Sequence, residues 1–419
     1  MNPGGMPLND IMTKWFEGIE KSRERLLKSG DVLLGALDTE IGKTPYDVVY
    51  EEDRIKLKHY RGAAEKQVAT PLLMVYALIN RETMLDLQPG RSVVQNFLNE
   101  GIDVYMIDWG YPTRKDRYLT IDDHVNGYLD NVVDFIRGRH GIPKINLMGI
   151  CMGGTFSIIY SALHPEKIKN LITTVTPSSF ETDQGLLHIW TKGIDLNGII
   201  EAYGNMPGDL LNLGFLLLNP ARLVIDKYIG FFENIDNKDF IENFIRMEKW
   251  IFDSPDVPGE TIRQFIEDCY KKNLLIQNKM EVGGKRVDLE NITMPLLNIY
   301  GKYDHLVPPS ACDQLTGKVG SLDTEDLCLE TGHIGIYVSS KFQRQFSPKI
   351  VQWLKQREAT SEAGLGRNAE AERSAGRAVK KAEQVVEDRS GRKIRTGKSA
   401  GIPKAWRQKK EAPLEAPLP

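Results

Sequence analysis

The chain has 419 residues, of which 41% are hydrophobic, and its charged residues nearly cancel to a formal net charge of -3. This composition is typical of a globular protein with a sizeable core, built as one large domain with insertions or as two domains. It argues against binding of nucleic acid or of an anionic membrane through overall charge. No apolar run approaches the ~18 residues of a membrane-spanning helix, so we predict no transmembrane segment.

Cysteine usage and the first residues indicate a reducing compartment. The N-terminal residues lack the charged start and apolar stretch of a secretory signal, so we expect a cytoplasmic protein. The four cysteines, Cys151, Cys269, Cys312 and Cys328, share no C-x-x-C spacing and are too sparse for a disulfide framework. We therefore expect reduced thiols, no metal site and no bound cofactor.

The predicted elements alternate along the chain between short strands and longer helices. Residues 1–46 are assigned to an N-terminal helical segment, and Asp47–Tyr50 and Arg54–Tyr60 to a hairpin. Further strands are predicted at Leu72–Ala77, Val104–Ile107, Ile145–Met148, Leu171–Thr176, Leu296–Tyr300 and Leu327–Leu329. Helices are predicted at Arg91–Asn99, Asp122–Arg137, Gly153–Leu163 and Phe342–Lys355. This alternation predicts a mostly parallel α/β sheet with helices on both faces.

Two segments depart from the alternation. Residues 177–291 are dense in Trp, Phe, Leu and Asn and are assigned to a cap, or lid, inserted into a core of residues 47–176 and 292–356. Residues 357–419 hold 15 Lys and Arg against 9 Asp and Glu and lack the apolar periodicity of a core. We expect this tail to be disordered or transiently helical. It is either a weak electrostatic tether to an acidic partner or surface, or a solvated extension without function.

A glycine-rich motif supplies the first candidate for chemistry. The apolar run Ile145–Met148 leads into Gly149-Ile150-Cys151-Met152-Gly153-Gly154, after which a helical pattern begins. Strand, sharp turn and helix in this order form the nucleophile elbow of the α/β-hydrolase fold, here with Cys in place of Ser. Side chains at Gly149 and Gly153 would collide with the neighbouring strand and helix, and the helix N-terminus favours a thiolate at Cys151. The alternative is a cysteine that merely packs in a turn.

The acid and the base are expected on loops after later strands, because in this fold they follow the nucleophile in that order. The predicted strand Leu296–Tyr300 precedes a loop with Asp304, and the next predicted strand precedes a loop with His333. We therefore predict that Cys151, Asp304 and His333 form a catalytic triad. His305 is the alternative base, but it directly follows Asp304, which makes a contact between the two awkward. We assign it a supporting role.

Acyl transfer also requires N–H donors for an oxyanion. The first is expected from the residue after the nucleophile, Met152, and the second from the loop after an early strand. Leu78-Ile79-Asn80 follows such a strand, and we choose Ile79. The alternative is that this tripeptide is an ordinary strand end.

Six motifs between residues 11 and 355 carry a resemblance to a known family: Tyr76-Ala77-Leu78-Ile79-Asn80-Arg81, Ile107-Asp108-Trp109-Gly110, Gly149-Ile150-Cys151-Met152-Gly153-Gly154, Met247-Glu248-Lys249-Trp250-Ile251-Phe252, Asp304-His305-Leu306-Val307-Pro308-Pro309 and Gly332-His333-Ile334-Gly335. They are similar to motifs of polyhydroxyalkanoate synthases, in particular the catalytic subunits of the two-subunit class III type. Class III members usually have Gln after the nucleophile, whereas Met152 resembles class IV. The resemblance therefore implies one of two types of partner subunit.

The resemblance implies an activity that the residues alone do not specify. In this family the cysteine carries the growing polyester, the histidine activates it, and the aspartate is linked to activation of the substrate's 3-hydroxyl. These roles fall on Cys151, His333 and Asp304. The implied substrate is an (R)-3-hydroxyacyl-coenzyme A, here 3-hydroxybutyryl-coenzyme A. The implied partners are a second subunit of PhaE type, or of PhaR type in class IV, and the surface of a polyhydroxyalkanoate granule in the cytoplasm. A homodimer or hetero-oligomer is expected.

Two other functions stay open on the residues alone. A cysteine hydrolase of the same fold, such as a lactone hydrolase or a polyester depolymerase, would share the triad but release free acid. A non-catalytic granule-binding protein would carry a vestigial site. Without the resemblance, the residues indicate only a thiol acyltransferase or hydrolase.

Overall fold

A mixed sheet forms the centre of the protein. The computed structural model describes residues 40–62, 64–182, 184–219 and 226–359, so the predictions for residues 1–39 and 360–419 lie outside the described residues. Eight strands pair in the order β1-β2-β4-β3-β5-β6-β9-β10. Their bounds are β1 Tyr46–Glu52, β2 Ile55–Tyr60, β3 Leu72–Val75, β4 Val104–Asp108, β5 Ile145–Ile150, β6 Ile168–Thr174, β9 Leu296–Gly301 and β10 Thr324–Leu329. The pairs β1–β2 and β2–β4 are antiparallel, and all other pairs are parallel.

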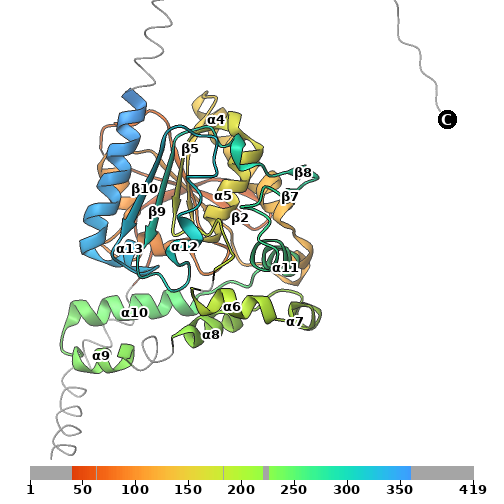
Figure 1. Ribbon diagram of the computed structural model, residues 1–419. Coiled ribbons are helices and arrows are strands. Elements are labelled where there is room, and N and C mark those ends of the chain that lie inside the picture. The colour runs from red at the N-terminus through yellow and green to blue at the C-terminus, as the bar shows by residue number, and fades with distance from the viewer. Residues whose placement is uncertain (1–39, 63, 183, 220–225, 360–419) are drawn as a thin grey trace, which may run out of the picture. The chain divides into compact units, whose positions relative to one another are not determined.

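Helices cover both faces of this sheet (Figure 1). The helices α4 (Asp130–His140) and α5 (Met152–Leu163) lie on one face, and the C-terminal helix of residues 340–359 lies on the other. Helix α3 (Val93–Asn99) joins the C-terminal helix through hydrogen bonds from Asn96 to Gln343 and Ser347. Shorter turns of helix are η1 Glu82–Asp86, η2 Arg114–Tyr118, η3 Asp123–Leu129, η4 Pro165–Lys167, η7 Leu289–Asn291, α12 Pro309–Cys312 and α13 Gly335–Val338. The predicted mostly parallel sheet with helices on both faces is confirmed.

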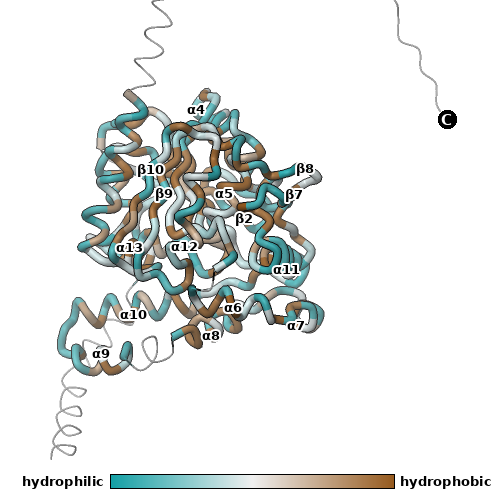
Figure 2. Tube along the Cα trace, in the orientation of Figure 1, coloured by the Kyte–Doolittle hydropathy of each residue, from teal (hydrophilic) through white to brown (hydrophobic). Residues whose placement is uncertain are grey.

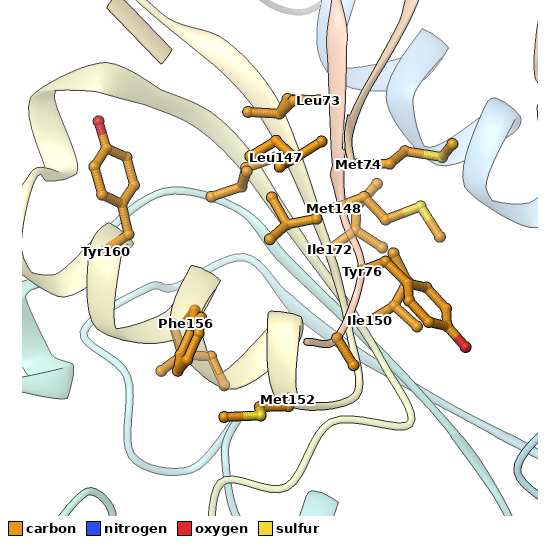
Figure 3. Close-up of a cluster of buried hydrophobic side chains, with 14 of the residues drawn as sticks. Leu73, Met74, Tyr76, Leu147, Met148, Ile150, Met152, Phe156, Tyr160 and Ile172 are labelled. Carbon is orange, nitrogen blue, oxygen red and sulfur yellow. The ribbon is translucent and has the colours of Figure 1, made fainter. Parts of the chain in front are cut away.

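The central strands of the sheet are buried along their whole length. Every residue of β3 and β5 is buried. Figure 3 shows Leu73, Met74, Leu147, Met148 and Ile172 together in this cluster, contributed by β3, β5 and β6. Full burial of one such side chain contributes ~1.5–3 kcal/mol to folding. The strand end from which the glycine-rich turn departs is therefore firmly held.

The chain leaves the sheet after β6 and returns to it at β9. Between them lie α6 Leu186–Gly193, α7 Leu196–Tyr203, α8 Gly208–Leu218, α9 Lys227–Glu233, α10 Lys238–Phe252, α11 Gly259–Gln264, the π-helix η6 Phe265–Lys271 and the hairpin of β7 Glu281–Val282 and β8 Lys285–Arg286. Helices α6 to α10 gather beyond one end of the sheet, and Figure 2 shows apolar stretches along α6 and α8. Gly283 and Gly284, which form the turn between β7 and β8, both have positive φ.

The C-terminal helix extends further than the sequence predicted. The tail was expected to begin at residue 357, but Arg357 pairs with Asp323, and Glu358 is buried against the sheet. The Glu358 carboxylate accepts hydrogen bonds from the Thr70 N–H at 3.2 Å and from the Lys169 ammonium at 2.5 Å. The core therefore continues at least to residue 359.

Glu358→Ala should lower the free energy of unfolding by about 1–3 kcal/mol, because it leaves the Thr70 N–H and the Lys169 ammonium without their buried acceptor. Urea denaturation of the full chain measures this loss. The control is Glu100→Ala, which breaks an exposed ion pair to Lys355 and should cost below about 1 kcal/mol. Equal losses in the two variants would contradict a structural role for Glu358.

Candidate active site

Cys151 stands at the sharp turn between β5 and α5. Its φ of 54° and ψ of -125° lie outside the regions that L-residues ordinarily adopt. A Cβ atom at Gly149 would lie 2.4 Å from the Cα of Gly154, and one at Gly153 would lie 2.3 Å from the carbonyl oxygen of Tyr76. The predicted collisions at Gly149 and Gly153 are thus confirmed. Only glycine permits strand, turn and helix to pack this closely.

Asp304 and His333 lie on the loops after β9 and β10, two adjacent parallel strands. Oδ1 of Asp304 accepts the N–H groups of Leu306 and Val307, each at 2.9 Å. Oδ2 of Asp304 lies 2.6 Å from Nδ1 of His333. The Asp304 side chain is fully buried, so its contacts fix both the carboxylate and the orientation of the imidazole.

His333 lines the same cavity as Cys151, and Cys151 is among the groups that influence the pKa of His333. Burial by itself would lower the pKa of His333, but the negative charges of Asp304 and of the Cys151 thiolate, with the hydrogen bond to Asp304, raise that pKa well above its ordinary value. An imidazole in this position is placed to accept a proton from Cys151. The helix N-terminus at Cys151 favours the negative sulfur that results. The structure thus brings Cys151, His333 and Asp304 into one connected series.

His305, the alternative base, occupies a different place. It is half-buried and lines the same cavity as Cys151. The imidazole that meets both Asp304 and Cys151 is that of His333.

Two backbone N–H groups lie close to Cys151. Met152 is the first residue of α5, and Ile79 belongs to the loop after β3; both line the cavity over Cys151. Neither N–H donates a hydrogen bond to any other described residue. Asn80, directly after Ile79, has a φ of 60°, a left-handed conformation that turns the chain. Both N–H groups are therefore available to a ligand.

A cavity of about 370 Å³ extends over Cys151 between the core and the cap. Its volume lies within the range of small-molecule sites. The core side includes the residues just described, and the cap side includes Leu187, Asn212, Phe215, Leu216, Trp250 and Ile251. Most of this lining is apolar, so the cavity can hold an acyl group and keep bulk water from Cys151.

Sequence patterns assigned no individual role to the cap residues in this lining. Phe215 belongs to a leucine-rich helix whose pattern does not reveal which face meets the core. Trp250 lies within one of the recognised motifs, and that motif was the signal that could have identified it. Tyr76 likewise belongs to a motif and lines the cavity.

No metal-binding arrangement occurs within residues 40–359 where they are described: no group of His, Cys, Asp and Glu is placed to hold a metal ion. In the same ranges, every helix is too short or too polar to cross a membrane. The four cysteines are unpaired; Cys269 and Cys312 are buried, and Cys328 is exposed.

Comparisons with known proteins agree with this geometry. Residues 70–339 match the model of the alpha/beta hydrolase fold, which confirms the predicted fold, and residues 1–97 match the model of the Poly-beta-hydroxybutyrate polymerase (PhaC) N-terminus. A relative from Allochromatium vinosum is 49% identical over 78% of this chain and 92% of its own length. Relatives from Haloferax mediterranei and Synechocystis sp. are 43% and 45% identical, over 90% and 83% of this chain and 77% and 97% of their own lengths. All three are named "Poly(3-hydroxyalkanoate) polymerase subunit PhaC".

His333→Gln should lower the rate at which iodoacetamide alkylates Cys151 at pH 7 by about tenfold or more, because the thiol loses the group that takes its proton. Mass spectrometry of the Cys151 peptide measures this rate. The exposed thiol of Cys328 is the internal control, since its alkylation should not change. An unchanged rate at Cys151 would show that His333 does not activate the sulfur.

Proposed function

The chain belongs to the family of poly(3-hydroxyalkanoate) polymerase subunits PhaC, and on this premise we propose that Cys151 carries the growing polyester. Its activity is that of a poly(3-hydroxyalkanoate) polymerase, an acyltransferase. The observation that supports the role of Cys151 is its position at a strained turn that opens into a cavity, which His333 also lines. The substrate that we propose is (R)-3-hydroxybutyryl-coenzyme A or a near homologue.

The first step loads the enzyme. His333 takes the proton of Cys151, and the thiolate attacks the thioester carbonyl carbon of the substrate. The N–H groups of Met152 and Ile79 stabilise the oxyanion of the tetrahedral intermediate. The carbon–sulfur bond to coenzyme A then breaks, and coenzyme A leaves with the proton from His333. One thioester replaces another, so little driving force is needed.

The second step lengthens the chain. The 3-hydroxyl of another hydroxyacyl-coenzyme A attacks the acyl group on Cys151, an ester bond forms, and the carbon–sulfur bond to Cys151 breaks. The lengthened chain is now a coenzyme A thioester and acylates Cys151 again by the first step. We assign the removal of the hydroxyl proton to His333. The carboxylate of Asp304 is buried and is occupied by His333 and two backbone N–H groups, which supports a role in orienting the imidazole.

Exclusion of water separates polymer synthesis from hydrolysis. An acyl group on Cys151 would lie in the cavity that four cap residues line with mostly apolar atoms: Phe215, Leu216, Trp250 and Ile251. This lining favours transfer to a hydroxyl over transfer to water. A cysteine hydrolase would need an entry for water at this point.

We extend the proposal to partners. The relatives are named as subunits, which supports a second chain in the active assembly, of PhaE type or, in a class IV enzyme, of PhaR type. The surface of a polyester granule and a second copy of the chain are the other partners that we propose. The coenzyme A thioester is a substrate, and the proposed chemistry uses no bound cofactor.

Cys151→Ala should abolish release of coenzyme A from (R)-3-hydroxybutyryl-coenzyme A without unfolding the chain, because alanine fits the turn but has no nucleophile. Thiol titration of released coenzyme A and circular dichroism measure the two effects. Residual turnover above a few per cent would contradict a covalent route. In the unaltered enzyme, free 3-hydroxybutyrate in place of polymer would identify a hydrolase.

Asp304→Asn should slow acylation of Cys151 and elongation by similar factors, about tenfold or more, because both steps depend on the orientation and charge of His333. Single-turnover labelling with radioactive substrate separates the two rates. Accumulation of acyl enzyme, with elongation alone impaired, would instead show that Asp304 activates the substrate hydroxyl.

A further inference from the structure

The loop from Tyr76 to Arg81 is held at both ends by tryptophan side chains. The indole N–H of Trp109 donates to the carbonyl oxygen of Tyr76 at 2.9 Å, and that of Trp250 donates to the carbonyl oxygen of Arg81 at 2.8 Å. Trp109 follows β4 in the core, whereas Trp250 belongs to α10 of the cap. Between these two contacts lie Ile79 and the left-handed Asn80. The loop is therefore attached to the core at one end and to the cap at the other.

The side chain of Arg81 is only 13% exposed and lies among acidic groups of the core. Its guanidinium donates to Glu82 at 3.0 and 3.2 Å and to Asp108 at 3.0 Å. Lys58 approaches the same two carboxylates, Glu82 at 2.5 Å and Asp108 at 2.8 Å. Two cations thus balance two anions, and the paired charges fix the guanidinium at the base of the loop.

The same guanidinium reaches the cap. It donates to the hydroxyl of Tyr111, which in turn donates to the Asp253 carboxylate at 2.5 Å. Asp253 is the residue directly after α10, and its carboxylate also lies 4.0 Å from Arg81. Arg81 therefore contacts the end of α10 by its side chain and by its backbone, and Trp250 on that helix lines the cavity.

We propose that Arg81 is a positioning residue for acyl transfer, which holds the Ile79 N–H toward Cys151 only while the end of α10 is docked on the core. Docking of the cap and completion of the oxyanion site are then one event. An undocked cap leaves the loop without its second attachment, so a thioester is not activated while water has access to Cys151. This inference rests on the proposed function, because it assigns a cause to the placement of Ile79.

The test separates acylation of Cys151 from simple alkylation. Acylation by (R)-3-hydroxybutyryl-coenzyme A needs an oxyanion site, whereas alkylation by iodoacetamide needs only the thiolate. In the full chain, Arg81→Met and Trp250→Phe should each lower the acylation rate by about tenfold or more, with most of the loss in kcat. Both variants should alkylate within about twofold of the unaltered enzyme. Arg81→Lys, which keeps the charge, should recover part of the acylation rate.

The control is Lys238→Met. Lys238 also lies on α10, and its ammonium pairs with Glu242 of the same helix at 3.8 Å, so this change leaves the contacts between α10 and the loop in place. Its acylation rate should stay within about twofold. The proposal would be overturned if Arg81→Met changed the acylation rate and the alkylation rate by the same factor. It would also be overturned if the control lost as much acylation rate as Arg81→Met.

If Arg81→Met fails to fold, Asp253→Asn takes its place. This change removes the charge at the exposed end of the contacts that run from Arg81 through Tyr111 to Asp253, and it should still lower the acylation rate but not the alkylation rate. An unchanged acylation rate there, together with a misfolded Arg81→Met, would also overturn the proposal. Failure of the proposed function has a different signature, since the unaltered enzyme itself would then form no acyl group on Cys151.

Discussion

The close approach of α5 to the end of β3 determines the rest of the site. A helix can start this near to a strand only if its first turn carries no side chain toward that strand, and Gly153 meets this condition against the carbonyl oxygens of Val75 and Tyr76. The approach places the Met152 N–H beside the loop that carries Ile79. Cys151, at the turn between β5 and α5, has a positive φ and lines the cavity.

The surroundings of the Cys151 sulfur combine buried charged groups with an apolar cavity lining. Burial lowers the pKa of His333, but the negative charge of the Asp304 carboxylate raises it, so that the pKa lies well above its ordinary value. Charges are costly to bury without partners, and Asp304 and His333 are partners of each other. The apolar lining above them strengthens their interactions because little water competes.

The patterns that could be read from the sequence were local or fixed by chain order. Alternating apolar runs predicted the strands, and the glycines around Cys151 predicted the turn. Beyond these, burial depended on partners far along the chain. The strand β6 begins at Ile168 and not at Leu171, because the polar Asn170 is buried through a hydrogen bond to Asn146 on β5. Glu358 was assigned to the tail for the same reason, since only Thr70 and Lys169 make its burial possible. Nothing in the apolar pattern distinguished the π-helix η3 from the α-helix that continues it.

Because the cap lies between β6 and β9 in the sequence, the parts of the active site leave the ribosome in a fixed order. The nucleophile turn and the strands β1 to β6 emerge first, but β6 cannot pair with β9 until the whole cap has been synthesised. Asp304 and His333 come later still, on the loops after β9 and β10. A nascent chain that has folded only its N-terminal part thus presents Cys151 without Asp304 and His333. The three side chains come together last, when the apolar cover over the sulfur has already been made.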